Sequence, residues 1–159
     1  MKHIGITVAD RGSAIVIVDR SSDGALLVVG IERLPFSLAA VTDRVSALDD
    51  EARFVIDAEG LGNALWAVLG RPDDAQRWQL YIGRGIERQQ LVDELLVAMQ
   101  EDRFHFAPGL AEQEAMTKAL LGYRRQVRED GLIGSELVVA LLLAIMPPPE
   151  PPRATEYAW

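Results

Sequence analysis

The sequence predicts an α/β domain built on a mixed five-stranded sheet, with its first three strands antiparallel and with helices on both faces. Three observations carry this prediction. The chain begins with β-branched apolar runs of strand length, it continues with short apolar runs that alternate with segments of helical period, and it contains no internal repeat. With 159 residues, 49% of them hydrophobic and 25% charged, it is large enough for one domain with its own core.

The first three strands are expected at residues 4–9, 13–19 and 25–32. Turn-forming residues separate these runs, at 10–12 and again at 21–24. Short turns join neighbouring antiparallel strands, so the three runs most simply form a meander.

The later chain reads as further strands connected by helices. Strands are predicted at 53–57 and 78–82, and residues 104–106 form a short extended piece. Crossovers through helices add strands in parallel, so we expect the fourth and fifth strands to be parallel members of the sheet. The spacing of apolar residues predicts helices over 37–48, 63–69, 86–101, 110–129 and 132–146.

Composition excludes several classes of protein. The net charge of −8, from 24 acidic and 16 basic residues, works against a protein that coats nucleic acid, because like charge repels the phosphate backbone. The absence of cysteine excludes disulfides and thiolate metal sites. The longest apolar run, at 137–146, is shorter than the roughly 18 to 20 residues that cross a bilayer, and the N-terminus reads as a strand rather than a signal peptide. We therefore expect a cytoplasmic protein without a membrane partner.

Asp57 is the most informative residue, because it ends the predicted strand at 53–57. Ligand chemistry in α/β sheets gathers at the carboxyl ends of strands. Position alone leaves two roles open for Asp57, a site carboxylate and a cap for the helix that follows. Residues 54–66, FVIDAEGLGNALW, resemble the second acidic motif of the nuclease domain of phage large terminases, in which a strand ends in Asp and a Gly-x-Gly turn leads into an apolar helix.

Other segments resemble that family in the same order along the chain. Residues 5–18 resemble its first hairpin, 83–88 the segment after its fifth strand, and 134–141 its final acidic helix. The resemblance implies a ribonuclease H-like fold over residues 1–146, with a proline-rich tail at 147–159. No Gly-Lys-Ser/Thr phosphate loop is present, so the ATPase half of a terminase is missing and a stand-alone protein is favoured over an excised domain.

The chemistry implied by the resemblance is phosphodiester hydrolysis by two Mg²⁺ or Mn²⁺ ions held by clustered carboxylates. The matching acids are Asp10, Asp57 and Glu136, which the resemblance makes both the catalytic residues and the metal ligands. Each also has a structural alternative. Asp10 can be an ordinary turn residue, and Glu136 can be an acid that favours a helix N-terminus.

The sequence departs from the family pattern at two acidic positions. Thr7 stands where the family has a first-strand Asp, and Ser135-Glu136 stands where it has an Asp-Asp pair. We therefore favour a degenerate phage relative that acts as an interaction or assembly module. The alternative is an active Mg²⁺- or Mn²⁺-dependent DNA endonuclease that works in phage DNA processing or packaging.

Two further features suggest partners. A set of basic residues is predicted to contact nucleic acid, with a solvated helix face as the alternative; these are Arg84, Arg88, Arg124, Arg125 and Arg128. The tail at 147–159 carries Tyr157 and Trp159 after a run of prolines, and is either frayed or a contact with another copy or another phage assembly protein. The expected location is the cytoplasm of an infected bacterial host.

Overall fold

The structure is a computed structural model that describes residues 1–9, 12–35, 37–82, 85–126 and 136–148. The elements, in chain order, are β1 (Lys2–Ala9), β2 (Gly12–Arg20), β3 (Leu26–Leu34), α1 (Leu38–Ser46), β4 (Arg53–Asp57), α2 (Gly62–Val68), β5 (Trp78–Tyr81), α3 (Gly85–Gln100), β6 (Phe104–Phe106), α4 (Gln113–Gln126) and α5 (Glu136–Ile145). The mixed α/β class predicted from the sequence is confirmed.

The strands form one mixed sheet in the order β5-β4-β1-β2-β3-β6. As predicted, β1, β2 and β3 are antiparallel, while β4 lies parallel to β1 and β5 parallel to β4. The sheet has six strands rather than the five expected, because β6 pairs in parallel with Leu26–Val28. A run of three residues carries too little periodicity to predict such a pairing.

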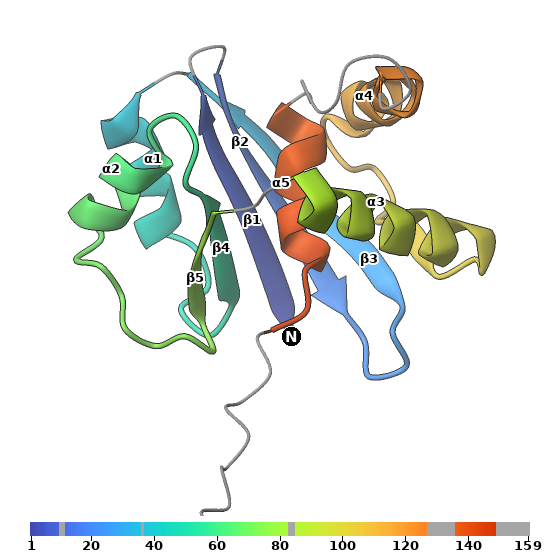
Figure 1. The fold of residues 1–159 in the computed structure, drawn as a ribbon, viewed down its shortest axis with the longest axis horizontal. Helices are drawn as coiled ribbons and strands as arrows, with labels where there is room; N and C mark the ends of the chain where they lie inside the picture. Colours follow the sequence, from blue (N-terminus) through green and yellow to red (C-terminus); the bar gives the residue numbers. More distant parts are fainter. Residues whose placement is uncertain (10–11, 36, 83–84, 127–135, 149–159) are drawn as a thin grey trace, which may run out of the picture.

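The helices cover both faces of the sheet, as expected. Figure 1 shows α1 and α2 on one side and α3, α4 and α5 on the other. Alternate side chains of the strands divide between the two layers: Ile4 and Ile6 pack with Val41 of α1 and Leu65 of α2, whereas Val16 belongs to the core under α5. The sheet is therefore covered by two separate apolar cores.

Helix α5 is the most buried helix of the α3–α5 layer, with every residue from Leu137 to Ile145 buried except Val139, which is half-buried. It packs across β1 and β2, near the middle of the sheet. Within the described ranges, no helix is both long enough and apolar enough to span a bilayer.

The start of α4 differs from the prediction. The helix was expected from residue 110, but it begins at Gln113, because Gly109 and Glu112 have φ values of 68° and 64°. A left-handed residue interrupts the right-handed helical backbone. The predicted end of this helix at 129 and the predicted start of the last helix at 132 fall outside the described residues.

Candidate functional site

The carboxylate of Asp57 lies at the carboxyl end of β4 and is only 6% exposed. Phe54 and Ile56 belong to the core under α1 and α2 and Val55 to the core under α5, so alternation along the strand places Asp57 on the α5 face. One carboxylate oxygen accepts a hydrogen bond of 3.1 Å from the backbone N–H of Glu59. Asp57 therefore caps the turn after β4 and also faces the layer that contains α5.

Two glycines allow the chain to turn sharply after Asp57. A Cβ on Gly62 would lie 1.5 Å from the Asp57 carbonyl oxygen, and Gly60 has a φ of 62°. A larger residue at position 62 would push α2 away from β4, and position 60 is in the left-handed region that glycine adopts at low cost. The Gly-x-Gly pair of the sequence thus serves a tight connection between strand and helix.

Thr7 of β1 lies beside Asp57 and contacts the first residue of α5. Ile6 pairs with Ile56 in the parallel β1–β4 register, so the next step along both strands places Thr7 next to Asp57. Thr7 is 4% exposed. Its hydroxyl donates a hydrogen bond of 3.4 Å to the backbone carbonyl of Glu136. Thr7, Asp57 and the start of α5 therefore meet at the same end of the sheet.

A close contact between strand and helix holds α5 in this place. A Cβ on Gly5 would lie 1.9 Å from the carbonyl oxygen of Ala140 and 2.7 Å from the nitrogen of Ala144. Only glycine at position 5 lets the helix approach β1 this closely. The Gly5-Ile6-Thr7 segment thus combines a packing residue with the site residue that departs from the family pattern.

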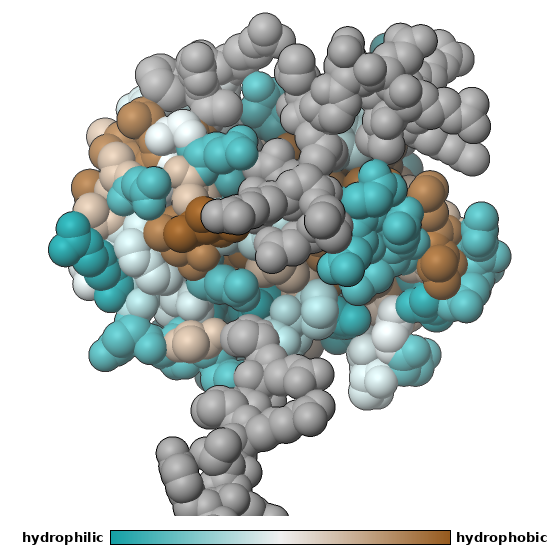
Figure 2. All heavy atoms as spheres, viewed as in Figure 1, coloured by the Kyte–Doolittle hydropathy of each residue, from teal (hydrophilic) through white to brown (hydrophobic). Residues whose placement is uncertain are grey.

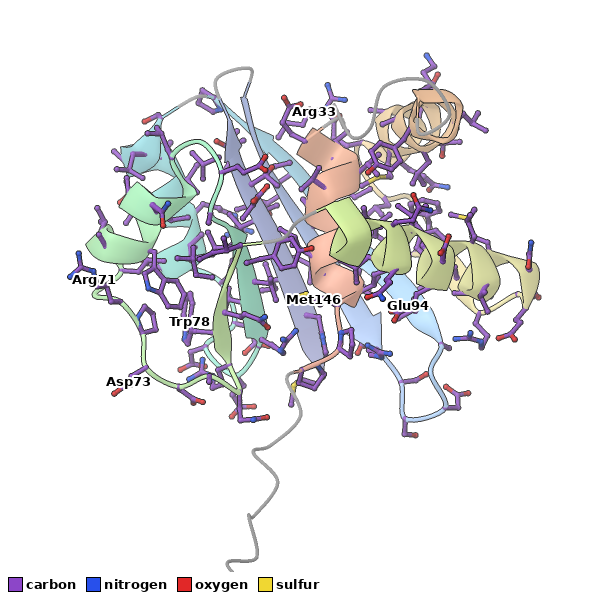
Figure 3. All side chains as sticks on the ribbon, in the orientation of Figure 1. Arg33, Arg71, Asp73, Trp78, Glu94 and Met146 are labelled. Carbon is purple, nitrogen blue, oxygen red and sulfur yellow. The ribbon has the colours of Figure 1, made fainter. Side chains whose placement is uncertain are left out.

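A small cavity lies next to Glu136. Its volume is about 150 Å³, and its lining includes Gly12, Ser13, Arg33 and Glu136. Arg33, which Figure 3 places near the N-terminal end of α5, also forms a 3.3 Å ion pair with Glu112. Pockets that enclose small ligands usually measure roughly 300 to 1,000 Å³. This cavity can admit an ion or water molecules but not a nucleotide.

Comparison with known proteins identifies the fold. The sequence matches no protein-family profile and no curated protein. The structure resembles the large terminase nuclease from thermophilic phage G20c with bound magnesium, with a TM-score of 0.64 at 17% identity over 91% of this chain and 80% of that one. It also resembles the Mn-soaked, inhibitor-bound terminase nuclease domain of human cytomegalovirus, with a TM-score of 0.53 at 14% identity over 89% and 79%.

The chain has the fold of a terminase nuclease domain. The fold expected from the resemblance in residues 54–66 is therefore confirmed, although both likenesses are at low identity. Relative to that expectation the sheet gains the short strand β6.

The described side chains at the site do not by themselves form a two-metal centre of the terminase-nuclease type. Clustered carboxylates are needed to hold two divalent ions. No group of three or more His, Cys, Asp or Glu residues that could hold a metal ion occurs in the described part of the chain. Asp57 and Glu136 lie at the Thr7 end of the sheet, while Asp10 is outside the described residues. The assignment of these three acids as ligands stays a prediction.

The predicted nucleic-acid contacts also stay a prediction. Arg88 belongs to α3, and Arg124 and Arg125 belong to α4, but the structure describes only the backbone at these positions and not the side chains. Arg84 and Arg128 lie outside the described residues altogether.

Two arginines hold the opposite end of α5, a feature that sequence reasoning missed. Arg53, which is 1% exposed, donates from Nη1 to the Met146 carbonyl at 2.9 Å and from Nη2 to Gln79 Oε1 at 2.7 Å. Arg20 donates to the Ile145 carbonyl at 3.2 Å. The last carbonyls of a helix lack partners within it and carry partial negative charge, so the two guanidinium groups act as a C-terminal cap. Burial, together with the charge of Arg20, lowers the pKa of Arg53.

His3 lies at this same end of the terminase-nuclease fold and is 5% exposed. Burial, together with the charges of Arg53, Arg20 and the N-terminal amine, lowers its pKa to about 4, while Asp19 opposes the shift. The imidazole is therefore neutral at pH 7, so it adds no positive charge beside the guanidinium groups of Arg53 and Arg20.

Proposed function

We propose that this chain is a phage protein that keeps the terminase-nuclease fold, lacks a complete two-metal acidic site, and acts as an interaction or assembly module. The observation that supports the proposal is the position of Thr7. Thr7 follows the Ile6–Ile56 pair and so lies next to Asp57 along the sheet, its hydroxyl bonds to the first residue of α5, and the family pattern has an acid at this position.

Thr7 reduces the negative charge available at this end of the sheet. A divalent ion is held by carboxylates because their negative charge offsets the cost of removing its water. A threonine hydroxyl is neutral, and here it already donates its hydrogen to the Glu136 carbonyl. With Asp57 and Glu136 as the described acids at this place, the site has too little negative charge to bridge two ions.

The proposed module role follows from what the fold retains. The two apolar cores, the tight turn at Gly62 and the close contact at Gly5 are structural requirements that do not depend on metal. The net charge of −8 adds to the argument, because an acidic surface weakens non-specific attraction to DNA. A fold can persist after its chemistry is lost, and it then serves as a scaffold for contacts.

Restoring the missing acid tests the proposal. We expect the wild-type chain to bind Mn²⁺ weakly in calorimetric titration and to leave supercoiled plasmid intact. Thr7→Asp places a third carboxylate beside Asp57, so in the absence of metal it should lower the melting temperature through charge repulsion. Mn²⁺ should then raise the melting temperature of Thr7→Asp well above its effect on the wild type, because an ion that binds only the folded state stabilises it.

Thr7→Asn is the matched control, because its side chain has the size of Asp without the charge. It should show no Mn²⁺-dependent rise. The double variant Thr7→Asp with Asp57→Asn should lose the rise again. A wild-type chain that nicks plasmid with Mn²⁺, with the activity abolished by Asp57→Asn, would contradict the degenerate site.

The second candidate is the active endonuclease of phage DNA processing or packaging. Two observations favour it: Asp57 and Glu136 lie at one end of the sheet, and the solved nuclease domains of similar fold were studied with magnesium or manganese. On this alternative Asp10 supplies the third carboxylate and the five predicted arginines contact DNA. Cleavage that depends on Asp10, Asp57 and Glu136 together, and that weakens when Arg124 and Arg125 are replaced by Gln, would support it.

A further inference from the structure

A larger pocket lies at the arginine-capped end of α5. Its volume is about 380 Å³, and its walls come from the end of β5, the middle of α3 and the residues that follow α5; they include Tyr81, Leu91, Glu94, Met146 and Pro147. Figure 3 shows Glu94 and Met146 beside each other at this place. The pocket is large enough for an aromatic side chain and has both an apolar wall and a carboxylate.

An exposed apolar residue borders the pocket. Ile82, the residue after β5, also lines it and is 77% exposed, the largest exposure among the large apolar residues of the described chain. Figure 2 shows an apolar area near the end of β5 and mostly hydrophilic residues over the nearer part of α3. An apolar side chain this exposed at the rim of a pocket is typical of a contact surface.

The neighbouring sheet edge is open. β5 is the last strand on its side of the sheet, and no described strand pairs with its outer side. The carbonyls of Arg77 and Tyr81 accept hydrogen bonds from Phe54 and Ala58 on the β4 side, at 2.6 and 2.9 Å. In a parallel strand, alternate residues point their peptide groups in opposite directions, so Leu80 presents its N–H and C=O to the open side. Such an edge can pair with an added strand.

The described part of the chain ends close to this pocket, because Pro147 forms part of its wall and residue 148 is the last one described. The sequence then continues with prolines up to 152 and with the segment 153–159, RATEYAW. This segment alternates Arg153, Thr155, Tyr157 and Trp159 with smaller or acidic residues, as a strand with one contact face does.

We propose that segment 153–159 of a second copy of the chain pairs with the open edge of β5 and places Tyr157 and Trp159 against Ile82 and the pocket. Arg153 is complementary in charge to Glu94, and an extended segment that adds to a sheet edge gains both main-chain hydrogen bonds and side-chain pockets. Proline-rich segments are extended and advance ~3.1 Å per residue, so in this proposal residues 147–152 act as a spacer that lets 153–159 reach the pocket of a partner. The exchange is reciprocal and closes as a two-fold dimer.

This dimer goes beyond the proposed function and does not depend on whether the acidic site is active. Light scattering on the full chain measures it directly. We expect twice the mass of one chain at roughly 100 µM, a concentration at which a complex of micromolar Kd is largely formed. Ile82→Glu and the pair Tyr157→Ser with Trp159→Ser should each reduce the mass to that of one chain.

Val68→Glu is the matched control, since Val68 is 56% exposed but lies on α2, on the other face of the sheet. It should leave the dimer intact. Circular dichroism establishes that each variant keeps the fold.

The absence of cysteine makes a specific cross-link available. An Ile82→Cys chain mixed with a Tyr157→Cys chain should give a disulfide-linked heterodimer on mild oxidation, and a Val68→Cys chain in place of the first should give at least tenfold less. A monomeric mass for the wild-type chain overturns the proposal, whether the pocket then holds its own tail or another protein. Equal cross-linking through positions 68 and 82 overturns it as well.

Discussion

The two ends of α5 differ in how their backbone groups are held. At the C-terminal end, the carbonyls of Ile145 and Met146 accept hydrogen bonds from Arg20 and Arg53 at 3.2 and 2.9 Å. At the N-terminal end, where the chain before Glu136 lies outside the described residues, the Thr7 hydroxyl donates a hydrogen bond of 3.4 Å to the Glu136 carbonyl. Among the described residues, the arginine-capped end therefore has the shorter side-chain hydrogen bonds of the two.

This difference indicates that the acids at the site can be replaced while the fold is kept. The helix is positioned by Arg53 and Arg20 and by its close contact with Gly5, and neither requires a carboxylate or a metal ion. An acid at the other end can be replaced, as at Thr7, while the arrangement of the layers is kept. The predictions below test this separation, beginning with the largest effect.

Arg53→Met should cause the largest loss of stability. The variant keeps most of the side-chain volume but leaves the Met146 carbonyl and the Gln79 amide without their buried partner, so the free energy of unfolding should fall by about 3 to 5 kcal/mol. Urea denaturation measures it. Arg33→Met is the control, because its ion pair with Glu112 is exposed and should be worth less than about 1 kcal/mol. Similar losses in the two variants would contradict the anchoring role of Arg53.

Gly5→Ala should come next, with a loss of about 2 to 3 kcal/mol. The added methyl group would lie 1.9 Å from the Ala140 carbonyl oxygen, so α5 has to move away from β1. Gly122→Ala is the opposite case within a helix: nothing lies within 4 Å of the added atom, and alanine should stabilise α4 by about 0.5 to 1 kcal/mol. Thermal unfolding of the pair checks the contrast, and a neutral Gly5→Ala would show that the helix is not tightly seated.

The arginine-capped end of α5 should also make the protein sensitive to acid. His3 has a pKa of about 4 in the folded chain and 6.5 as its ordinary value, so below pH 6.5 the unfolded chain binds its proton first. Neutral His3 makes its full contribution to the free energy of unfolding above pH 6.5, and this contribution is lost as the pH falls toward 4. Between pH 7 and 5 the loss should be about 2 kcal/mol.

His3→Gln isolates this effect, because glutamine is polar but does not titrate in this range. Urea denaturation at several pH values should give the variant a flatter dependence than the wild type between pH 6.5 and 4. Parallel curves for the two proteins would mean that His3 does not contribute.

Glu136→Gln should have the smallest effect on stability. The carboxylate interacts with the N-terminal end of the α5 dipole, which is worth about 0.5 kcal/mol at a partly exposed position. Glu114→Gln, in the first turn of α4, provides a comparison at another helix start. A loss of several kcal/mol in Glu136→Gln alone would indicate that the acid holds α5 in place, and the separation between fold and site would then fail.

Much of the fold could be predicted because its signals are local. The β-branched runs and their turns specify the meander, and the FVIDAEGLG segment specifies a strand, a carboxylate and a tight turn within nine residues. The pairing of β6 with β3 could not be predicted, because three residues give no pattern and their partners are at Leu26–Val28. The early break before α4 depends on the left-handed Glu112, a residue type that carries no such signal.

The candidate site divides in the same way. Asp57 could be placed from its position at the end of a strand, and Thr7 could be recognised as a departure from a family pattern. The role of Arg53 could not be predicted, since its partners Gln79 and Met146 lie 26 and 93 residues away along the chain. The sequence reads Arg53 simply as the first residue of a strand.

The amino-acid sequence by itself determined the order of strands and helices, the acids available for chemistry, and the glycines at the sharp turns, because periodicity and backbone preference act over a few neighbouring residues. The tertiary structure alone decided which groups meet: Thr7 with the start of α5, the arginines with its end, and an exposed Ile82 beside an open strand edge. The physical reason is that a buried polar group must find its partner wherever packing brings one, at any distance along the chain.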